Sequence, residues 1–184
     1  MFRLLSLSGS LRAASSNSVL LDAAAAIGAD GLTISAYTGL GTLPHFNPDL
    51  EADLPPAVAA LRETIGQADG LLISCPEYAR GIPGAFKNAL DWLVASETFP
   101  GMPVALFNAS PRASDAQAAL RLVLSTMSAE LVESASITLP LLGAPRTVAG
   151  IVGDAAMRET IARALAAFRA RLDAIAAIAT TGPR

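Results

Sequence analysis

FRLLSLSGSLRAASSNSVLLDAAAAI, residues 2–27, joins three local patterns that together decide the fold. Residues 2–7 form a short apolar run rich in leucine, which predicts a buried strand. Gly9 follows and begins a turn rich in hydroxyl side chains, and residues 17–27 have the apolar spacing of a helix. A strand, a glycine turn and a helix in this order are typical of the first unit of an α/β domain with a parallel sheet.

The same alternation repeats along the chain and predicts five such units. The strands are expected at residues 2–7, 32–36, 70–74, 103–108 and 130–137, and the helices at 17–27, 56–67, 83–95, 114–127 and 154–178. Because parallel strands need helical crossovers, this order predicts an open sheet covered by helices on both faces. We expect one domain over residues 1–179, a disordered tail at 180–184, and a connection at 140–153 that forms a lid or an interface element.

Composition excludes several classes of protein. Of the 184 residues, 52% are hydrophobic and 16% are charged, which is typical of globular proteins and not of disordered ones. The apolar segments carry charged residues and none approaches the roughly 20 apolar residues of a membrane span. The net charge is −3 and the basic residues are scattered, so we expect no nucleic-acid partner and no membrane surface.

The cysteine and histidine content points to an organic cofactor for any redox chemistry. One cysteine cannot form an internal disulfide, and one histidine leaves no cysteine and histidine cluster for zinc, so we expect no metal. The first residues lead directly into a strand and turn and lack the pattern of a signal peptide, which favours a cytoplasmic protein.

In open parallel sheets, ligands bind outside the carboxyl ends of the strands, near the point where strand order reverses. The loop at residues 9–17 offers a phosphate serine hydroxyls, an arginine and the amides of a helix N-terminus. It lacks the Gly-Lys-Ser/Thr ending of a P-loop and the spaced glycines of the dinucleotide fingerprint, so a monophosphate fits better. The alternative is that its serines and asparagine are ordinary helix caps and its arginine an ordinary surface charge.

Three motifs in order give the chain a family resemblance. GSLRAASSN at residues 9–17, LPHFNPDLE at 43–51 and PEYARGIPGAFKNALDWL at 76–93 together resemble the NADPH-dependent FMN reductase family, which includes quinone, chromate and azo-dye reductases. The resemblance implies a flavodoxin-like three-layer fold, with a five-stranded parallel sheet in the order 2-1-3-4-5 and helices on both faces.

The resemblance also implies roles for residues of the first and third motifs. The FMN phosphate would be held by Ser10, Arg12, Ser15 and Asn17, and the isoalloxazine ring would lie along Pro76, Glu77 and Tyr78. Two positions depart from the family pattern Pro-Glu-Tyr-Asn-x-Ser, because Ala79 replaces the asparagine and Gly81 replaces the serine. We expect polar contacts to the flavin to be lost there, with weaker flavin retention or a changed pocket as consequences.

The implied activity is hydride transfer from NADPH or NADH to FMN and on to a quinone, a flavin or another small oxidant. The cofactor carries the chemistry, so no catalytic side chain is required, and the kinetics should be ping-pong. Relatives are dimers or tetramers, and we expect a homodimer or homotetramer here. Two other functions stay open, namely a flavodoxin-like electron carrier and a flavin-free binding or regulatory descendant of the family.

Residues after the strand at 103–108 give a weaker signal. Ser110 could donate a hydrogen bond to the flavin edge, and Arg112 could steer the phosphate of a nicotinamide cofactor. A Ser-Pro sequence is also a plain turn, and Arg112 could be a plain solvated charge.

Other polar residues have structural interpretations. Cys75 is expected to pack as a small buried residue, since no base partner for a thiol nucleophile is evident. His45 is expected to be a structural loop residue, although it could touch a substrate. Lys87 and Asp91 lie four residues apart on one helix and should form a solvated pair, whereas Trp92 could belong to the core or to an interface.

Overall fold

A computed structural model describes residues 1–141 and 147–181 of the chain. The strands are β1 (Phe2–Ser8), β2 (Leu32–Ala36), β3 (Gly70–Ser74), β4 (Pro103–Asn108), β5 (Glu130–Leu131) and β6 (Ile137–Thr138). The α-helices are α1 (Ser16–Ile27), α2 (Pro56–Gly66), α3 (Gly84–Leu93), α4 (Ser114–Thr126), α5 (Val148–Gly153) and α6 (Ala155–Thr181). Three short 3-10 helices accompany them, η1 (Leu40–Thr42), η2 (Pro48–Leu50) and η3 (Glu133–Ala135).

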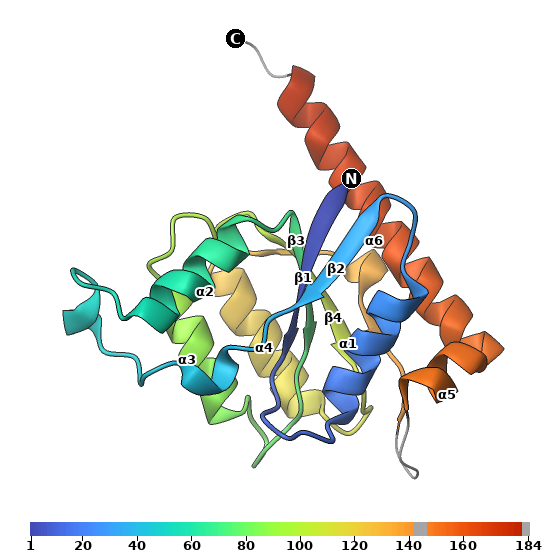
Figure 1. Ribbon diagram of the computed structural model, residues 1–184, viewed down its shortest axis with the longest axis horizontal. Coiled ribbons are helices and arrows are strands. Elements are labelled where there is room, and N and C mark those ends of the chain that lie inside the picture. The colour runs from blue at the N-terminus through green and yellow to red at the C-terminus, as the bar shows by residue number, and fades with distance from the viewer. Residues whose placement is uncertain (142–146, 182–184) are drawn as a thin grey trace.

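The sheet is parallel, with the strand order β2-β1-β3-β4-β5, which confirms the predicted order (Figure 1). β3 and β4 are buried along their whole length, because both faces of the central strands are covered by helices. The order reverses direction between β1 and β3, where Leu7 lies opposite Ile73 in the register.

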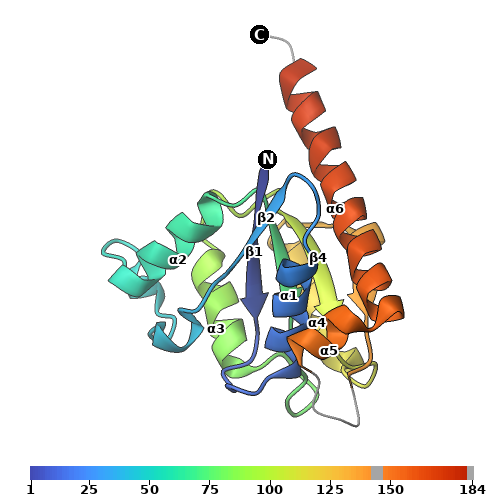
Figure 2. The same cartoon turned by 45° about the vertical axis from the view of Figure 1, so that its right-hand side comes forward.

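Two hydrophobic cores lie on opposite faces of the sheet. One joins α1, α5 and α6 to the strands through residues such as Leu20, Ile151 and Phe168. The other joins α2, α3 and α4 to the strands through residues such as Ile65 and Phe86. Figures 1 and 2 show α2 and α3 on one side of the strands and α1 and α6 on the other. The predicted three-layer sandwich is therefore confirmed.

The prediction of one continuous strand at residues 130–137 was wrong, because two short strands and a 3-10 helix lie there. β5 and β6 both pair with β4, and η3 interrupts the path between them. The hydroxyl of Ser136 accepts a hydrogen bond from the Leu106 amide across 3.0 Å and donates one to the Val132 carbonyl across 3.1 Å. The Ser136 side chain thus accepts a hydrogen bond from β4 that the backbone of a continuous strand would otherwise accept. The turn of η3 buries Ala135 completely.

The C-terminal region differs from the prediction in two places. α5 forms within the predicted connection at 140–153, where the Thr147 hydroxyl caps it by accepting from the Gly150 amide across 3.1 Å. Residues 142–146 of that connection lie outside the described residues. α6 continues through Thr181, past the predicted helix end at Ile178, and residues 182–184 of the predicted tail also lie outside the described residues.

The last turns of α6 extend past the amino ends of the strands in both views (Figures 1 and 2). The sequence of this long helix is interrupted by arginine and acidic residues. Within residues 1–141 and 147–181, none of the helices combines the length and the apolar character that crossing a membrane requires.

Candidate functional site

A cleft opens at the carboxyl ends of β1, β3 and β4, which is where the sequence placed the site. Its volume is about 320 Å³. Four of the predicted site residues line it, namely Asn17, Pro76, Glu77 and Ser110, together with Asn108 and Arg112. The cleft lies beside the reversal of strand order between β1 and β3, the usual ligand position in such sheets. We call this space the main cleft.

The loop between β1 and α1 carries the first turn of α1 to the wall of the main cleft. Ser15 is the N-cap of α1, because its side chain accepts a hydrogen bond from the Ser18 amide across 3.4 Å, and it is only 3% exposed. Ser16 and Asn17 follow as the first helical residues and line the cleft. The positive end of the α1 dipole is therefore next to the cleft, and no acidic residue lies in the first turn to offset it.

Gly9 allows this loop to approach the end of β3. Its amide donates to the Ser74 carbonyl across 2.8 Å. A Cβ atom at this position would lie 3.1 Å from the Cys75 sulfur and 3.3 Å from the Phe86 ring, which is tighter than ordinary contacts. A larger residue would push the turn away from β3, so the closeness of the two loops depends on glycine.

Asn17 is buried, and only one of the two polar atoms of its side chain forms a hydrogen bond within the described residues. Its Oδ1 accepts a hydrogen bond from the Ser74 hydroxyl across 2.8 Å, and the asparagine is 8% exposed. Within the described residues, the side-chain nitrogen of Asn17, Nδ2, has no hydrogen-bond partner. A buried donor without a partner at the wall of a cleft, beside a helix N-terminus, fits an anionic oxygen.

Ser10 and Arg12 do not line the main cleft. They line a neighbouring cavity of about 410 Å³ on the β2 side of α1, where the Ser10 hydroxyl accepts from the Arg12 amide across 3.3 Å. Arg12 forms no ion pair with any residue that the structure describes, so its guanidinium has no carboxylate partner there. The residues that the sequence predicts around one phosphate therefore line two adjacent cavities. Asn17 lines the main cleft, whereas Ser10 and Arg12 line the neighbouring cavity.

Tyr78 to Gly81 form a tight two-residue hairpin. The Tyr78 amide donates to the Gly81 carbonyl across 3.1 Å, and the Gly81 amide donates to the Tyr78 carbonyl across 3.0 Å. The two residues between them, Ala79 and Arg80, have φ angles of 50° and 62°, as a type I′ turn requires. Asparagine tolerates this conformation better than alanine. The turn conformation thus gives a second explanation for the asparagine that the family pattern has where this chain has Ala79, in addition to the polar contact to the flavin inferred from the sequence.

Tyr78 and Arg12 line a third cavity of about 370 Å³, together with Gly9 and Leu11. The tyrosine is 47% exposed and Leu11 is 61% exposed. Tyr78, which was predicted to contact the ring, directly follows two residues of the main cleft, Pro76 and Glu77, in the sequence. Tyr78 itself lines the third cavity and not the main cleft. Residues of the segment 9–17 therefore contribute to the lining of all three cavities.

Glu77 has a side-chain partner that the sequence analysis missed. Its Oε2 accepts hydrogen bonds from the amides of Asp115 and Ala116, across 2.9 and 3.0 Å. These amides belong to the first turn of α4. The residue was expected to lie along the flavin with its backbone and side chain; the structure places it in the lining of the main cleft, with its carboxylate bonded to the start of a helix. No local signal could have shown this, because the partners lie 38 and 39 residues away.

The loop after β4 is held by its own side chains. Asn108, which is 7% exposed, accepts a hydrogen bond from the Ser110 amide through its Oδ1 across 3.1 Å. The Ser110 hydroxyl accepts from the Arg112 amide across 3.2 Å. The hydrogen of that hydroxyl is then available for an acceptor in the main cleft, as the sequence prediction for Ser110 requires. Asn108 was not predicted as a site residue, although it ends a buried strand at the ligand side of the sheet.

Burial keeps the Cys75 thiol neutral. The residue is completely buried, and desolvation raises its pKa to about 12. Because a thiolate is required for nucleophilic chemistry, the interpretation of Cys75 as a packed residue is confirmed. His45 is exposed and lines none of the three cavities. Lys87 and Asp91 form the predicted pair across 2.5 Å.

Comparison with known proteins decides the family. The model of the NADPH-dependent FMN reductase family matches residues 2–141. The chain belongs to this family. The matched region contains every strand that the structure describes, all three sequence motifs and the residues that line the three cavities.

Two curated relatives resemble this chain over part of their length. A 2-hydroxy-1,4-benzoquinone reductase from Burkholderia sp. is 42% identical over 84 residues, which cover 46% of this chain and 45% of the relative. An NAD(P)H-dependent FMN reductase from Pseudomonas aeruginosa is 39% identical over 111 residues, 59% of this chain and 60% of the relative. The chain thus spans about half to three fifths of the length of these relatives.

A solved structure resembles almost the whole fold. The flavoenzyme NAD(P)H:(acceptor) oxidoreductase from Paracoccus denitrificans has a TM-score of 0.77 and 27% identity, with 95% of this chain and 98% of that chain covered. This agreement supports the flavodoxin-like arrangement of the sheet and helices.

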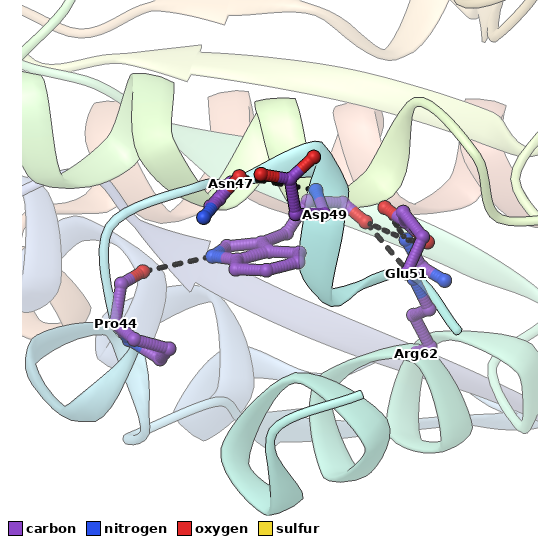
Figure 3. A network of polar contacts seen from close by, with 6 residues as sticks. Pro44, Asn47, Asp49, Glu51 and Arg62 are labelled. Carbon is purple, nitrogen blue, oxygen red and sulfur yellow. Dashed lines mark hydrogen bonds and ion pairs between the residues drawn. The ribbon is translucent and has the colours of Figure 1, made fainter. Parts of the chain in front are cut away.

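The second family motif, at residues 43–51, anchors the chain between β2 and α2. The Trp92 indole of α3 donates to the Pro44 carbonyl across 2.8 Å, as the dashed line in Figure 3 shows. Arg62 of α2 bonds both carboxylate oxygens of Glu51 and also the Trp92 carbonyl. Asn47 caps η2 by accepting from the Asp49 amide across 3.0 Å. This motif is therefore structural, and Trp92, which is completely buried, belongs to the core.

Proposed function

We propose that the chain binds FMN and uses NADPH or NADH to reduce a quinone, a flavin or another small oxidant. The single observation that carries the proposal is the buried Asn17 amide, which lacks a partner among the described residues beside the N-terminus of α1. A phosphate oxygen would satisfy this donor and would lie in the positive field of the helix. Membership of the NADPH-dependent FMN reductase family supports the choice of FMN.

The residues fit the cofactor in two groups. For the phosphate, Asn17 and the α1 amides lie in the wall of the main cleft, Ser15 fixes the start of the helix, and Ser10 and Arg12 approach from the adjacent cavity. For the ring, Pro76 and Glu77 would supply backbone groups from one wall and Ser110 a hydroxyl from the other. Tyr78 would cover the ring from the third cavity with an apolar plane.

The proposed contribution of the chain to the reaction is to position the cofactor and to provide a positive electrostatic field at the N-terminus of α1. FMN supplies hydride acceptance and hydride donation when it is bound. The neutral thiol of Cys75 and the helix-bound carboxylate of Glu77 are not placed as proton donors or bases. Arg112, exposed at the edge of the main cleft, is proposed to attract the phosphate of the nicotinamide substrate.

Steady-state kinetics with two substrates test the proposed activity. The FMN-loaded protein should give parallel double-reciprocal lines when NADPH is varied at several fixed quinone concentrations, because the oxidised nicotinamide leaves before the quinone binds. Arg112→Ala should raise the KM for NADPH more than the KM for the quinone. Intersecting lines would contradict the proposed cycle, and equal effects on both KM values would contradict the role of Arg112.

Cellular location and assembly also belong to the proposal. We propose a cytoplasmic homodimer or homotetramer of one-domain subunits that acts on small molecules and has no nucleic-acid or membrane partner. The exposure of Leu11 and Tyr78 beside the third cavity supports a subunit contact near the cofactor, because exposed apolar residues grouped at a cavity often mark an interface. Light scattering after size-exclusion chromatography would give the oligomeric state directly, and a monomer would contradict this part.

A further inference from the structure

We infer that Glu77 is a positioning residue for the flavin, and that it acts by locking the loop after β3 to the N-terminus of α4. The inference rests on the proposed FMN site, because it concerns the two walls between which the ring would lie. One wall is the segment at residues 76–81, and the other is the segment at 108–113 together with the start of α4. We call these the hairpin wall and the helix wall.

The helix wall begins with a helix that lacks a cap of its own. Ala113 occupies the N-cap position of α4 and has no side-chain oxygen to accept from the first-turn amides. The Asp115 and Ala116 amides are the two that an N-cap serine or aspartate would ordinarily satisfy. Both donate to one oxygen of Glu77, across 2.9 and 3.0 Å. The carboxylate of the hairpin wall is therefore the missing cap of the helix wall.

This arrangement gives one side chain control over the width of the main cleft. Glu77 and Pro76 line the cleft from the hairpin wall, and Ala113 lines it from the helix wall. A local cap at position 113 would stabilise α4 without constraining the hairpin wall. A cap donated from the hairpin wall stabilises α4 only when the two walls are at the correct separation. The chemistry of the contact, an anion at a helix N-terminus, makes it a strong link.

The second contact between the two walls is much weaker. Arg80 Nε lies 3.4 Å from Asp115 Oδ2, but the arginine side chain is 86% exposed and the pair is screened by solvent. Within the hairpin wall, the turn is held by the two backbone bonds between Tyr78 and Gly81. Loss of the Glu77 carboxylate should therefore free the hairpin wall from α4, and the two backbone bonds between Tyr78 and Gly81 should then open more often.

Three variants separate positioning from simple stabilisation of α4. Glu77→Ala removes the cap, and Glu77→Gln keeps an oxygen that can accept from the same amides. Leu124→Ala is the matched control, because Leu124 is completely buried in the last turn of α4 and lines none of the three cavities. Leu124→Val replaces it if Leu124→Ala does not fold. Each folded variant is titrated with FMN by fluorescence, and its amide hydrogen exchange is measured without FMN.

The inference predicts that Glu77→Ala raises the Kd for FMN about tenfold or more, comparable to the loss when a residue that orients a metal ligand is removed. Glu77→Gln, which keeps an acceptor but loses the charge, should give a Kd between those of the unmodified chain and Glu77→Ala, and the Leu124 variant should stay within about threefold of the unmodified chain. Glu77→Ala alone should also speed exchange across the hairpin wall, at the Tyr78 and Gly81 amides. The inference is overturned if Glu77→Ala binds FMN normally, or if the Leu124 variant weakens FMN binding equally.

The exchange measurement keeps this inference apart from the proposed function. If the unmodified chain does not bind FMN, the proposed function fails, yet exchange at Tyr78 and Gly81 still shows whether Glu77 holds the hairpin wall. Unchanged exchange at these amides in Glu77→Ala would overturn the coupling whatever the result with FMN.

Discussion

The Ser74 hydroxyl donates a hydrogen bond across 2.8 Å to the Asn17 side-chain oxygen, and this buried contact joins the end of β3 to the first turn of α1. The two residues are 57 positions apart in the chain. In this arrangement the side-chain oxygen of Asn17 faces Ser74, and the side-chain nitrogen has no hydrogen-bond partner among the described residues. The end of β3 thus orients a donor of α1 toward the proposed phosphate.

Asn17→Asp should weaken binding of FMN while leaving riboflavin binding almost unchanged. The new carboxylate can still accept from Ser74, but it adds a negative charge where the phosphate is proposed to lie. Repulsion between like charges at a partly desolvated site should raise the Kd for FMN about tenfold or more at pH 8. Fluorescence titration with each ligand measures both constants. An equal loss for FMN and riboflavin would place the phosphate elsewhere.

Ala79→Asn should stabilise the protein. Ala79 has a φ of 50°, in the left-handed region that costs an alanine about 1 kcal/mol and that asparagine occupies more readily. We expect a gain of about 0.5 to 1 kcal/mol in the free energy of unfolding, measured by urea titration. Ala52→Asn is the control, since Ala52 is exposed and its φ is not positive. A gain at both positions would show that the turn conformation is not the cause.

Cys75 should make the protein less stable at alkaline pH. Burial raises the thiol pKa from its ordinary value of about 9 to about 12. The unfolded chain therefore releases this proton first, and stability that is fully present below pH 9 is lost as the pH rises toward 12. The loss approaches about 1.4 kcal/mol per pH unit.

Comparison with Cys75→Ala isolates this effect. At pH 7.5 the substitution should lower the free energy of unfolding by about 1 kcal/mol, because it removes packed atoms beside Gly9. Between pH 9 and pH 10.5 the deficit should shrink or reverse, since the variant has no thiol to titrate. Urea titrations across this range give the two curves, and parallel curves would refute the assignment.

Asn88→Ala should destabilise the fold without harming the flavin site. Asn88 accepts from the Phe46 amide across 2.7 Å and donates to the Pro44 carbonyl across 2.9 Å, so it holds the second motif against α3. Loss of both bonds should lower the free energy of unfolding by about 1 to 3 kcal/mol, and Asn88→Asp, which keeps the first bond, should lose less. The Kd for FMN should stay within about threefold, and a larger change would give the second motif a direct role in binding.

The sequence predicted the central strands well because their signal is local. β2, β3 and β4 have the predicted bounds, since buried parallel strands are short apolar runs between turn residues. The strand at 130–137 failed because its interruption depends on Ser136, whose hydroxyl bonds the distant Leu106 amide. A contact between residues 30 apart leaves no periodic trace in the sequence.

The candidate site shows the same division between local and distant causes. The position of the main cleft followed from parallel topology, which brings the loops after β1, β3 and β4 to one edge. The separation of Arg12 and Tyr78 into adjacent cavities depends on how the loops turn after leaving the strands. The engagement of Glu77 with α4 depends on the absence of a local cap at Ala113, and a single motif cannot reveal that pairing.

The central claim is best tested by one spectrum followed over time. The purified protein is incubated with FMN, freed of excess cofactor, and mixed with NADPH in the absence of oxygen while the flavin band at about 450 nm is recorded. We predict that the protein retains FMN and that the band bleaches rapidly after NADPH is added. Failure to retain FMN, or retained FMN whose band NADPH and NADH leave unchanged, would contradict the proposed nicotinamide-dependent reductase.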